Sequence, residues 1–98
     1  MWVKIHNSSR KVIAVCDENL LGKKFEQGIK QLQITESFFK GEKMLKEEVS
    51  NLMISEFKNG STFNIVGKES VKIAIEAGVA QKGARLKVKN IPFVIVVN

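Results

Sequence analysis

Short apolar runs rich in β-branched residues alternate with two segments of helical periodicity, and this order constrains the fold more than any other feature of the sequence. Runs of about five alternating or continuous apolar residues are typical of strands, whereas apolar residues that recur every three to four positions are typical of helices. Because the helical segments lie between strands, we expect an α+β protein. Its small mixed sheet of about five or six strands would have two helices packed on one face.

The expected elements follow the order β-β-β-α-β-α-β-β, with a structured loop after the second strand. The expected strands are residues 2–6, 11–16, 29–34, 62–66, 85–91 and 93–97, with Pro92 separating the last two. The loop comprises residues 17–26, and a short helical region starts at Thr35 and is broken by Gly41.

The two main helices are expected at residues 42–57 and residues 67–77. The apolar stripe of the first is Leu45, Val49, Leu52, Met53 and Phe57, and Glu42 and Lys46 would pair one turn apart on it. Gly78 would end the second helix in the left-handed conformation.

Length and composition indicate one globular domain, residues 1–98. Hydrophobic residues make up 44% of the chain and charged residues 27%, which is not the composition of a disordered protein. The longest apolar run, residues 93–97, is far shorter than the ~20 residues that cross a bilayer. The first residues lack the pattern of a signal peptide, so we expect a cytoplasmic protein without a membrane partner. One cysteine and one histidine allow no internal disulfide and no four-ligand Cys/His zinc site, and we expect no metal or cofactor.

Positive charge is concentrated at the two ends of the chain. Sixteen Lys and Arg residues against ten Asp and Glu residues give a net charge of +6. Residues 1–16 contribute +3 and residues 80–98 contribute +4, both without an acid, while the segment between them contributes −1. This segregation predicts a basic patch and an anionic partner. Lysine strongly outnumbers arginine, which favours loose phosphate binding over bidentate recognition of bases.

The terminal strands carry the candidate nucleic-acid-binding residues. These are Trp2, Lys4, Arg10, Arg85, Lys87 and Lys89. The three bases of residues 85–89 recur with period two and so project from one face of a strand, and Trp2 shares a face with Lys4 and His6. If the two strands were neighbours, they would form a basic face on which Trp2 stacks a base. The alternative is a solvated sheet face whose edge lysines prevent aggregation, and the sequence leaves both interpretations open.

Three local motifs contain chemically active groups, and for each of them we favour a structural interpretation. Cys16 precedes a helical turn, where a thiol can become a nucleophile, but an unpaired cysteine is more often a buried core residue. Asp17 and Glu18 could bind a cation, but an aspartate at this position ordinarily caps the turn that follows it. Lys68, after Gly67, lies at a strand-to-helix junction that can hold an anion, but the full phosphate-loop motif is absent.

The sequence resembles an archaeal family, domain of unknown function number 424. The resemblance lies in residues 14–26 (AVCDENLLGKKFE), residues 64–71 (NIVGKESV) continuing as residues 74–78 (AIEAG), and the closing Ile91-Pro92 before an apolar strand. It covers nearly the whole chain in the expected order. It implies a small, single-domain cytoplasmic protein without an established activity. The usual family pattern has a histidine where this chain has Phe93, which weighs against an essential histidine-based chemistry.

The resemblance also implies one polar site, formed if the loop after the second strand lies beside the turn before the second main helix. Its residues would be Cys16, Asp17, Gly22, Lys23, Asn64, Gly67 and Lys68. Our leading interpretation is nevertheless a non-enzymatic protein that binds RNA or a ribonucleoprotein through its basic strands. The alternatives are a small-molecule or enzymatic site at residues 16–23, or a protein-interaction module. That module could include a homodimer formed through a C-terminal edge strand at residues 93–97.

Overall fold

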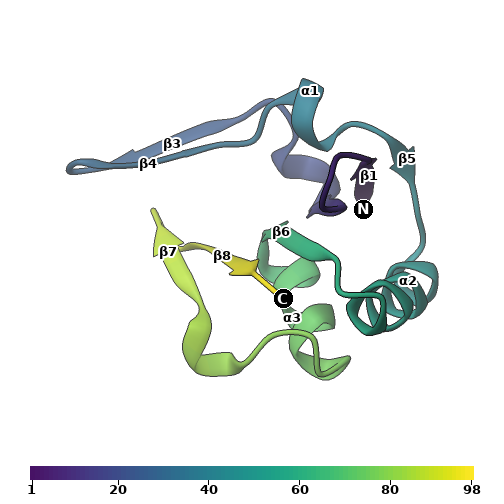
Figure 1. The fold of residues 1–98 in the computed structure, drawn as a ribbon. Helices are drawn as coiled ribbons and strands as arrows, with labels where there is room; N and C mark the ends of the chain where they lie inside the picture. Colours follow the sequence, from purple (N-terminus) through teal and green to yellow (C-terminus); the bar gives the residue numbers. More distant parts are fainter.

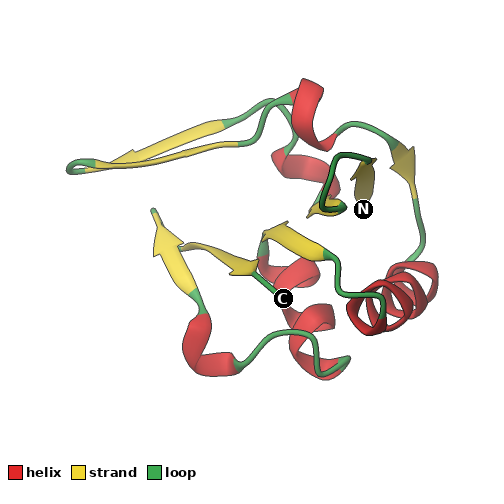
Figure 2. Cartoon of the chain, in the orientation of Figure 1, coloured by secondary structure: helices red, strands yellow, loops and turns green.

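A six-stranded mixed sheet in the order β5-β1-β2-β6-β8-β7 organises the computed structural model, which describes residues 1–98 (Figure 1). The strands are β1 (Trp2–His6), β2 (Val12–Cys16), β3 (Lys24–Gln27), β4 (Lys30–Gln33), β5 (Glu42–Lys43), β6 (Thr62–Val66), β7 (Leu86–Val88) and β8 (Ile91–Val96). The helices are α1 (Glu36–Phe39), α2 (Lys46–Lys58) and α3 (Lys68–Glu76), with short 3-10 turns η1 (Glu18–Leu20) and η2 (Lys82–Ala84). Figure 2 shows how strands and helices follow one another along the chain. No helix has the length and apolar character needed to span a bilayer.

The strand pairing confirms the predicted mixed sheet. β2 and β6 pair in parallel, with Val12 opposite Thr62 and Cys16 opposite Val66, and the other pairs in the sheet are antiparallel. A parallel pair requires a crossover connection, which here includes α2. Because the parallel pair occupies the middle of the sheet, the first and last strands of the chain lie on opposite sides of it.

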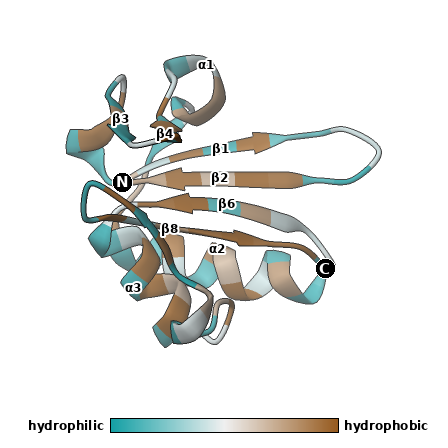
Figure 3. Cartoon of the chain, turned by 90° about the vertical axis from the view of Figure 1, so that its left-hand side faces the viewer, coloured by the Kyte–Doolittle hydropathy of each residue, from teal (hydrophilic) through white to brown (hydrophobic).

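Helices α2 and α3 pack on one face of the sheet, as predicted (Figure 1). Alternate residues of β2 and β6 point to this face, because side chains of a strand alternate between its two sides. They form the main core with side chains from both helices; its members include Ile13, Phe63, Val49, Met53 and Val71. Figure 3 shows the apolar strands lying against these helices. Burial of this apolar surface stabilises the fold by about 25 cal/mol per Å².

A second, smaller core covers part of the opposite face, and the sequence did not reveal this layer. It joins residues of β2 and β6 to η1, the segment after β4 and α1, and includes Ala14, Cys16, Leu20, Ile34 and Phe39. Residues 24–26, expected in the loop of residues 17–26, instead form β3 together with Gln27 and pair with β4 as a separate hairpin. This hairpin extends away from the core (Figure 1). Its tip is linked to the β7–β8 turn, because Gln27 Oε1 accepts a hydrogen bond from the Lys89 backbone N–H at 3.0 Å.

The first main helix begins four residues later than predicted. Glu42 and Lys43 form β5 against β1, and α2 starts at Lys46, so the expected Glu42–Lys46 pair on one helix face does not exist. The Glu48 side chain accepts a hydrogen bond from the Leu45 backbone N–H at 2.8 Å and thereby satisfies a free donor at the start of α2. The buried face of α2 is also smaller than the predicted apolar stripe. Val49 and Met53 are buried, whereas Leu45 is 73% exposed.

The predicted break at Pro92 is wrong. The chain turns at Lys89 and Asn90, which both have positive φ angles of 51° and 64°, and β8 starts at Ile91 and includes Pro92. Two consecutive positive φ values are the geometry of a type I′ hairpin turn. The sequence Lys-Asn does not predict this turn, because type I′ turns prefer Asn-Gly, Asp-Gly or Gly-Gly. The C-terminal strand is also not simply an edge strand, since β7 pairs with Ile91, Pro92 and Phe93 on its outer side.

Candidate functional site

The structure does not bring the two basic terminal strands together. β1 and β7 are separated by β2, β6 and β8, so the single basic face that would join Lys4 to Lys87 does not form. Arg10 lies in the β1–β2 connection, across the sheet from β7. The period-two pattern of Arg85, Lys87 and Lys89 also does not lie on one strand, because β7 comprises only Leu86–Val88. The sequence could not give the order of the strands.

The polar face of β1 is occupied by other parts of the chain. Lys4 Nζ donates a hydrogen bond to the Ser37 carbonyl at 2.7 Å, and His6 Nε2 lies 2.8 Å from the Phe38 carbonyl. The ring of Trp2 lies beneath two lysines, with Lys40 Nζ and Lys43 Nζ each 5.7 Å from its centroid. A base stacking on Trp2 would have to displace these cation–π contacts.

Two cations of the C-terminal segment, Lys82 and Arg85, lie instead along a groove between α3 and η2. This α3–η2 groove has a volume of about 370 Å³ and is lined by Lys68, Val71, Lys72, Ile75, Glu76, Lys82, Arg85 and Pro92. Four of these residues are cationic and one is acidic. None of the four cations forms an ion pair within the chain, because the four salt bridges of the structure involve other residues. The groove therefore carries an excess of positive charge, with four cations and one carboxylate, Glu76, in its lining.

Two elements fix the geometry of the α3–η2 groove. Lys68 and Lys72 are four residues apart and therefore lie on the same side of α3, one turn apart. Arg85 follows η2 and its Nε donates a hydrogen bond to the Lys82 carbonyl at 3.1 Å, which holds the guanidinium near the turn.

Lys87 pairs with Pro92, so its side chain lies on the side of the sheet that carries Pro92 and α3.

Two residues of this groove, Lys72 and Lys82, were missed by the sequence analysis. The sequence contains a pattern that points to each of them. Lys72 follows Lys68 at helical spacing, and Lys82 belongs to the acid-free segment of residues 80–98. What the sequence lacked was the packing of η2 beside α3, which brings the two sets together. Lys89, in contrast, lies in the turn at the end of β7, with its backbone tied to the β3–β4 hairpin.

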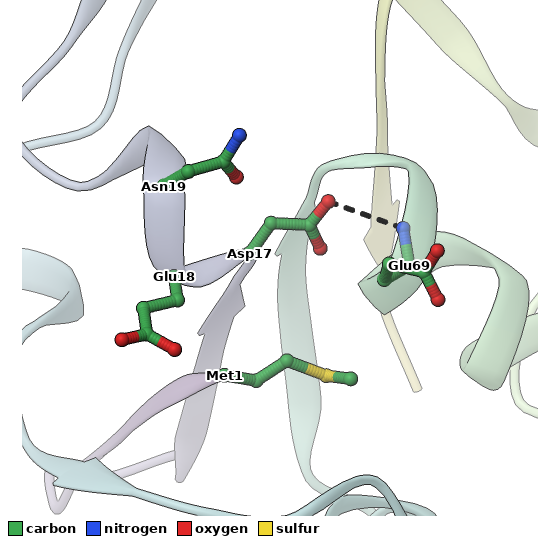
Figure 4. A pocket seen from close by; sticks show the side chains of 5 residues that line it. All are labelled: Met1, Asp17, Glu18, Asn19 and Glu69. Atoms are coloured by element: carbon green, nitrogen blue, oxygen red, sulfur yellow. Dashed lines mark hydrogen bonds between the residues drawn. The ribbon is translucent and has the colours of Figure 1, made fainter.

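Asp17 joins the loop after β2 to the start of α3. Its carboxylate accepts hydrogen bonds from the backbone N–H groups of Glu69 at 3.1 Å and Ser70 at 2.8 Å, and from the Ser70 hydroxyl at 2.7 Å. The prediction that Asp17 caps the turn following it is wrong, since its side chain makes no capping bond to η1. It caps α3, where free N–H groups and the helix dipole favour a negative charge (Figure 4).

Gly67 allows this close approach. Its φ is +108°, and a Cβ atom at this position would overlap the Asp17 carboxylate. Cys16, Asp17, Gly67 and Lys68 therefore meet at one end of the β2–β6 pair. Gly22 and Lys23 instead bond through their backbones to Ile34 and Leu20 at the base of the hairpin. Asn64 lies in the middle of β6, opposite Ala14.

The environment of Cys16 does not suit a nucleophile. Its side chain is fully buried, and burial, followed by the nearby negative charge of Asp17, raises its thiol pKa to about 12. A thiol with this pKa holds almost no thiolate at neutral pH, and thiolate is the reactive form. The favoured interpretation of Cys16 as a core residue agrees with this burial.

A cavity of about 610 Å³ beside Asp17 has an acidic lining of Met1, Asp17, Glu18, Asn19 and Glu69. Figure 4 shows the Asp17 carboxylate directed at the backbone of α3 and the Glu18 side chain directed away from it. Glu18 pairs with Lys43, and this hydrogen bond and charge lower the pKa of its carboxyl. No three His, Cys, Asp or Glu side chains in the structure converge as a metal site would require.

Comparison with known proteins agrees with the resemblance seen in the sequence. The profile of the family described as Protein of unknown function (DUF424) matches residues 5–98. An uncharacterised conserved protein from Methanopyrus kandleri, solved by crystallography, has a similar fold, with a TM-score of 0.85 and 22% sequence identity over 98% of this chain and 90% of that one. At this identity the similarity shows the fold alone. No curated protein matches the sequence.

Proposed function

The chain belongs to this family of proteins of unknown function, and we propose that it binds RNA by holding the phosphate backbone in the α3–η2 groove. One observation carries the proposal: Lys68, Lys72, Lys82 and Arg85 line a single groove without an ion-pair partner. Like charges held close together destabilise a fold slightly, so their gathering in one place favours a ligand that neutralises them.

The composition of the groove favours a phosphodiester backbone over a sequence-specific contact. Three of its four cations are lysines, which attract phosphates as point charges but lack the planar fork that recognises guanine. Of its apolar lining residues, Val71 and Pro92 are buried, so only the half-buried Ile75 offers apolar surface that a ribose can contact. The expected binding is therefore strong in its salt dependence and weak in its sequence preference.

This proposal keeps part of the surface expected from the sequence and replaces the rest. Arg85 lines the groove, and Lys87 lies on the same side of the sheet as Pro92, so both remain candidate phosphate contacts. Trp2, Lys4 and Arg10 lie across the sheet and are left out. A small-molecule or enzymatic site at residues 16–23 has no comparable support, because the Cys16 thiol is buried and the Asp17 carboxylate is engaged by α3.

The proposal is tested by fluorescence anisotropy with a labelled single-stranded RNA of about 12 nucleotides at several salt concentrations. If four phosphates are contacted, the affinity should fall by about 50-fold between about 50 and about 200 mM salt, since each contact contributes roughly −0.7 to the slope. The variant K72E/K82E should bind at least about 10-fold more weakly, with a slope shallower by about 1.4.

A matched control separates the groove from general charge attraction. The variant K46E/K58E changes the net charge equally at two exposed lysines of α2 that form no ion pair. It should retain most of the affinity. Equal weakening in both variants, or wild-type affinity in K72E/K82E, would show that the groove does not hold RNA.

A further inference from the structure

The outer edge of β8 is open along the second half of the strand. β7 pairs with Ile91 through Phe93 only, and the ladder ends where Leu86 faces Phe93. The Pro92 carbonyl accepts a hydrogen bond from the Gly67 N–H, so the backbone groups of Pro92 face β6. Because these directions alternate along a strand, the N–H and C=O of Ile95 face outward, as do those of Val97 if the extended chain continues past the end of β8. No backbone hydrogen bond outside the ladders reaches either residue.

This open edge lacks the protection that the other two edges of the sheet have. β5 has only two residues, both charged, and β7 has three residues with Lys87 at its centre. Short strands and charged side chains are the usual means of preventing edge-to-edge pairing. Residues 93–98 contain no charged residue, and the side chains of Ile95 and Val97 are 57% and 70% exposed. The edge therefore combines free hydrogen-bonding groups with exposed apolar side chains.

We propose that this edge pairs with the same edge of a second copy of the chain, antiparallel about a two-fold axis at Val96. In this register Ile95 of each copy lies opposite Val97 of the other, and the two outward-facing residues exchange backbone hydrogen bonds. Phe93 keeps its β7 partner. The side chains of Ile95 and Val97 lie on one face, so the pairing brings four apolar side chains together on the continuous sheet.

A second copy suits this edge better than a charged partner segment would. The edge is self-complementary, as the interface of a two-fold dimer must be. Neither residues 93–98 nor β6 carries a charge, so the net charge of +6 is not concentrated at the contact. The contact involves few residues on each side and falls below the standard interface size of about 1,200–2,000 Å², so the association should be weak and concentration-dependent.

Sedimentation velocity measures this association directly. The wild-type protein should sediment as a monomer near 5 µM and shift toward a dimer by about 500 µM, a range suited to weak interfaces. The variant I95K/V97K should remain monomeric throughout, because two charges on each strand oppose the pairing. The control I29K/L45K adds the same charges at two other exposed apolar residues and should behave as the wild type.

A cysteine at the axis tests the register. V96C should form a disulfide-linked dimer under mild oxidation, since residues opposite each other at a non-hydrogen-bonded pair are about 4.5 Å apart between Cα atoms. The native Cys16 is fully buried and should not cross-link. A wild-type protein that is monomeric at every concentration, a dimer that survives in I95K/V97K, or a V96C variant that does not cross-link would each overturn the proposal.

Discussion

The carboxylate of Asp17 and the side chain and backbone of Ser70 form two hydrogen bonds, at 2.7 and 2.8 Å, across 53 residues of sequence. Asp17 is nearly buried and Ser70 is fully buried, so these bonds are shielded from water. They connect the end of β2 to the first turn of α3, the helix that carries Lys68 and Lys72. The position of the α3–η2 groove therefore depends on a residue that is not part of it.

Removing this connection should destabilise the protein. D17A leaves the N–H groups of Glu69 and Ser70 without their acceptor, and we expect a loss of about 2–4 kcal/mol of unfolding free energy. S70A removes only the hydroxyl bond and should cost about 1 kcal/mol. Urea denaturation of both single variants and of the double variant measures the coupling. Simple additivity of the two losses would contradict a direct interaction between the residues.

Gly67 should tolerate a side chain less well than the other glycines with a positive φ, which have open space where a Cβ would lie. G67A places a methyl group against the Asp17 carboxylate at a φ of +108°, and we expect a loss of about 2–4 kcal/mol. G78A is the matched control, because Gly78 has a positive φ of 78° but open space around its position for a Cβ. It should cost only about 1 kcal/mol. Similar losses in thermal denaturation would show that backbone strain, and not the contact with Asp17, determines both.

The residues that specify β2, β6 and α3 could be recognised because their patterns are local. β6 spans Thr62–Val66 as predicted, and α3 runs from Lys68 to Glu76 between Gly67 and Gly78. Periodicity and glycine position depend only on neighbours in the chain, so they predict these elements without knowledge of the tertiary fold. The same holds for the short helix after Thr35, whose hydroxyl accepts a hydrogen bond from the Phe38 N–H.

The candidate site could not be recognised in the same way, because it depends on long-range placement. Which strand lies beside which decides whether Lys4 and Lys87 share a surface, and no local pattern encodes that order. The expected first turn of α2 does not form, because Glu42 and Lys43 pair with β1 as the edge strand β5. This pairing joins residues about 40 positions apart in the chain. Tertiary pairing of this kind overrides local helical preference.

The turn between β7 and β8 offers a stabilising substitution. Lys89 and Asn90 adopt positive φ angles, which cost an ordinary L-residue such as lysine about 1–2 kcal/mol and asparagine less. The variant K89N/N90G carries the sequence preferred in type I′ turns, and we expect it to raise the unfolding free energy by about 0.5–1 kcal/mol. Were the turn located at Pro92 instead, a glycine at position 90 would lie within a strand and lower the stability. Thermal denaturation distinguishes the two signs.

Cys16 makes stability depend on pH in the alkaline range. In the unfolded chain its thiol loses the proton near the ordinary pKa of 9.0, whereas in the folded protein burial and Asp17 raise the pKa to about 12. Between these values the folded protein holds a proton that the unfolded chain has released, so the unfolding free energy decreases as pH rises, by about 1.4 kcal/mol per pH unit from this group. Below pH 9 both states hold the proton and the contribution is constant.

The variant C16A isolates this contribution, because lysines and other alkaline groups titrate alike in both proteins. Its cavity should lower the stability at neutral pH, and the difference from the wild type should shrink as pH rises above 9. A thiol reagent provides a second readout at pH 7, where labelling should proceed only through opening of the fold. A difference between wild type and C16A that stays constant from pH 8 to about pH 11, or labelling as fast as in the unfolded chain, would show that the thiol is not shielded by the core.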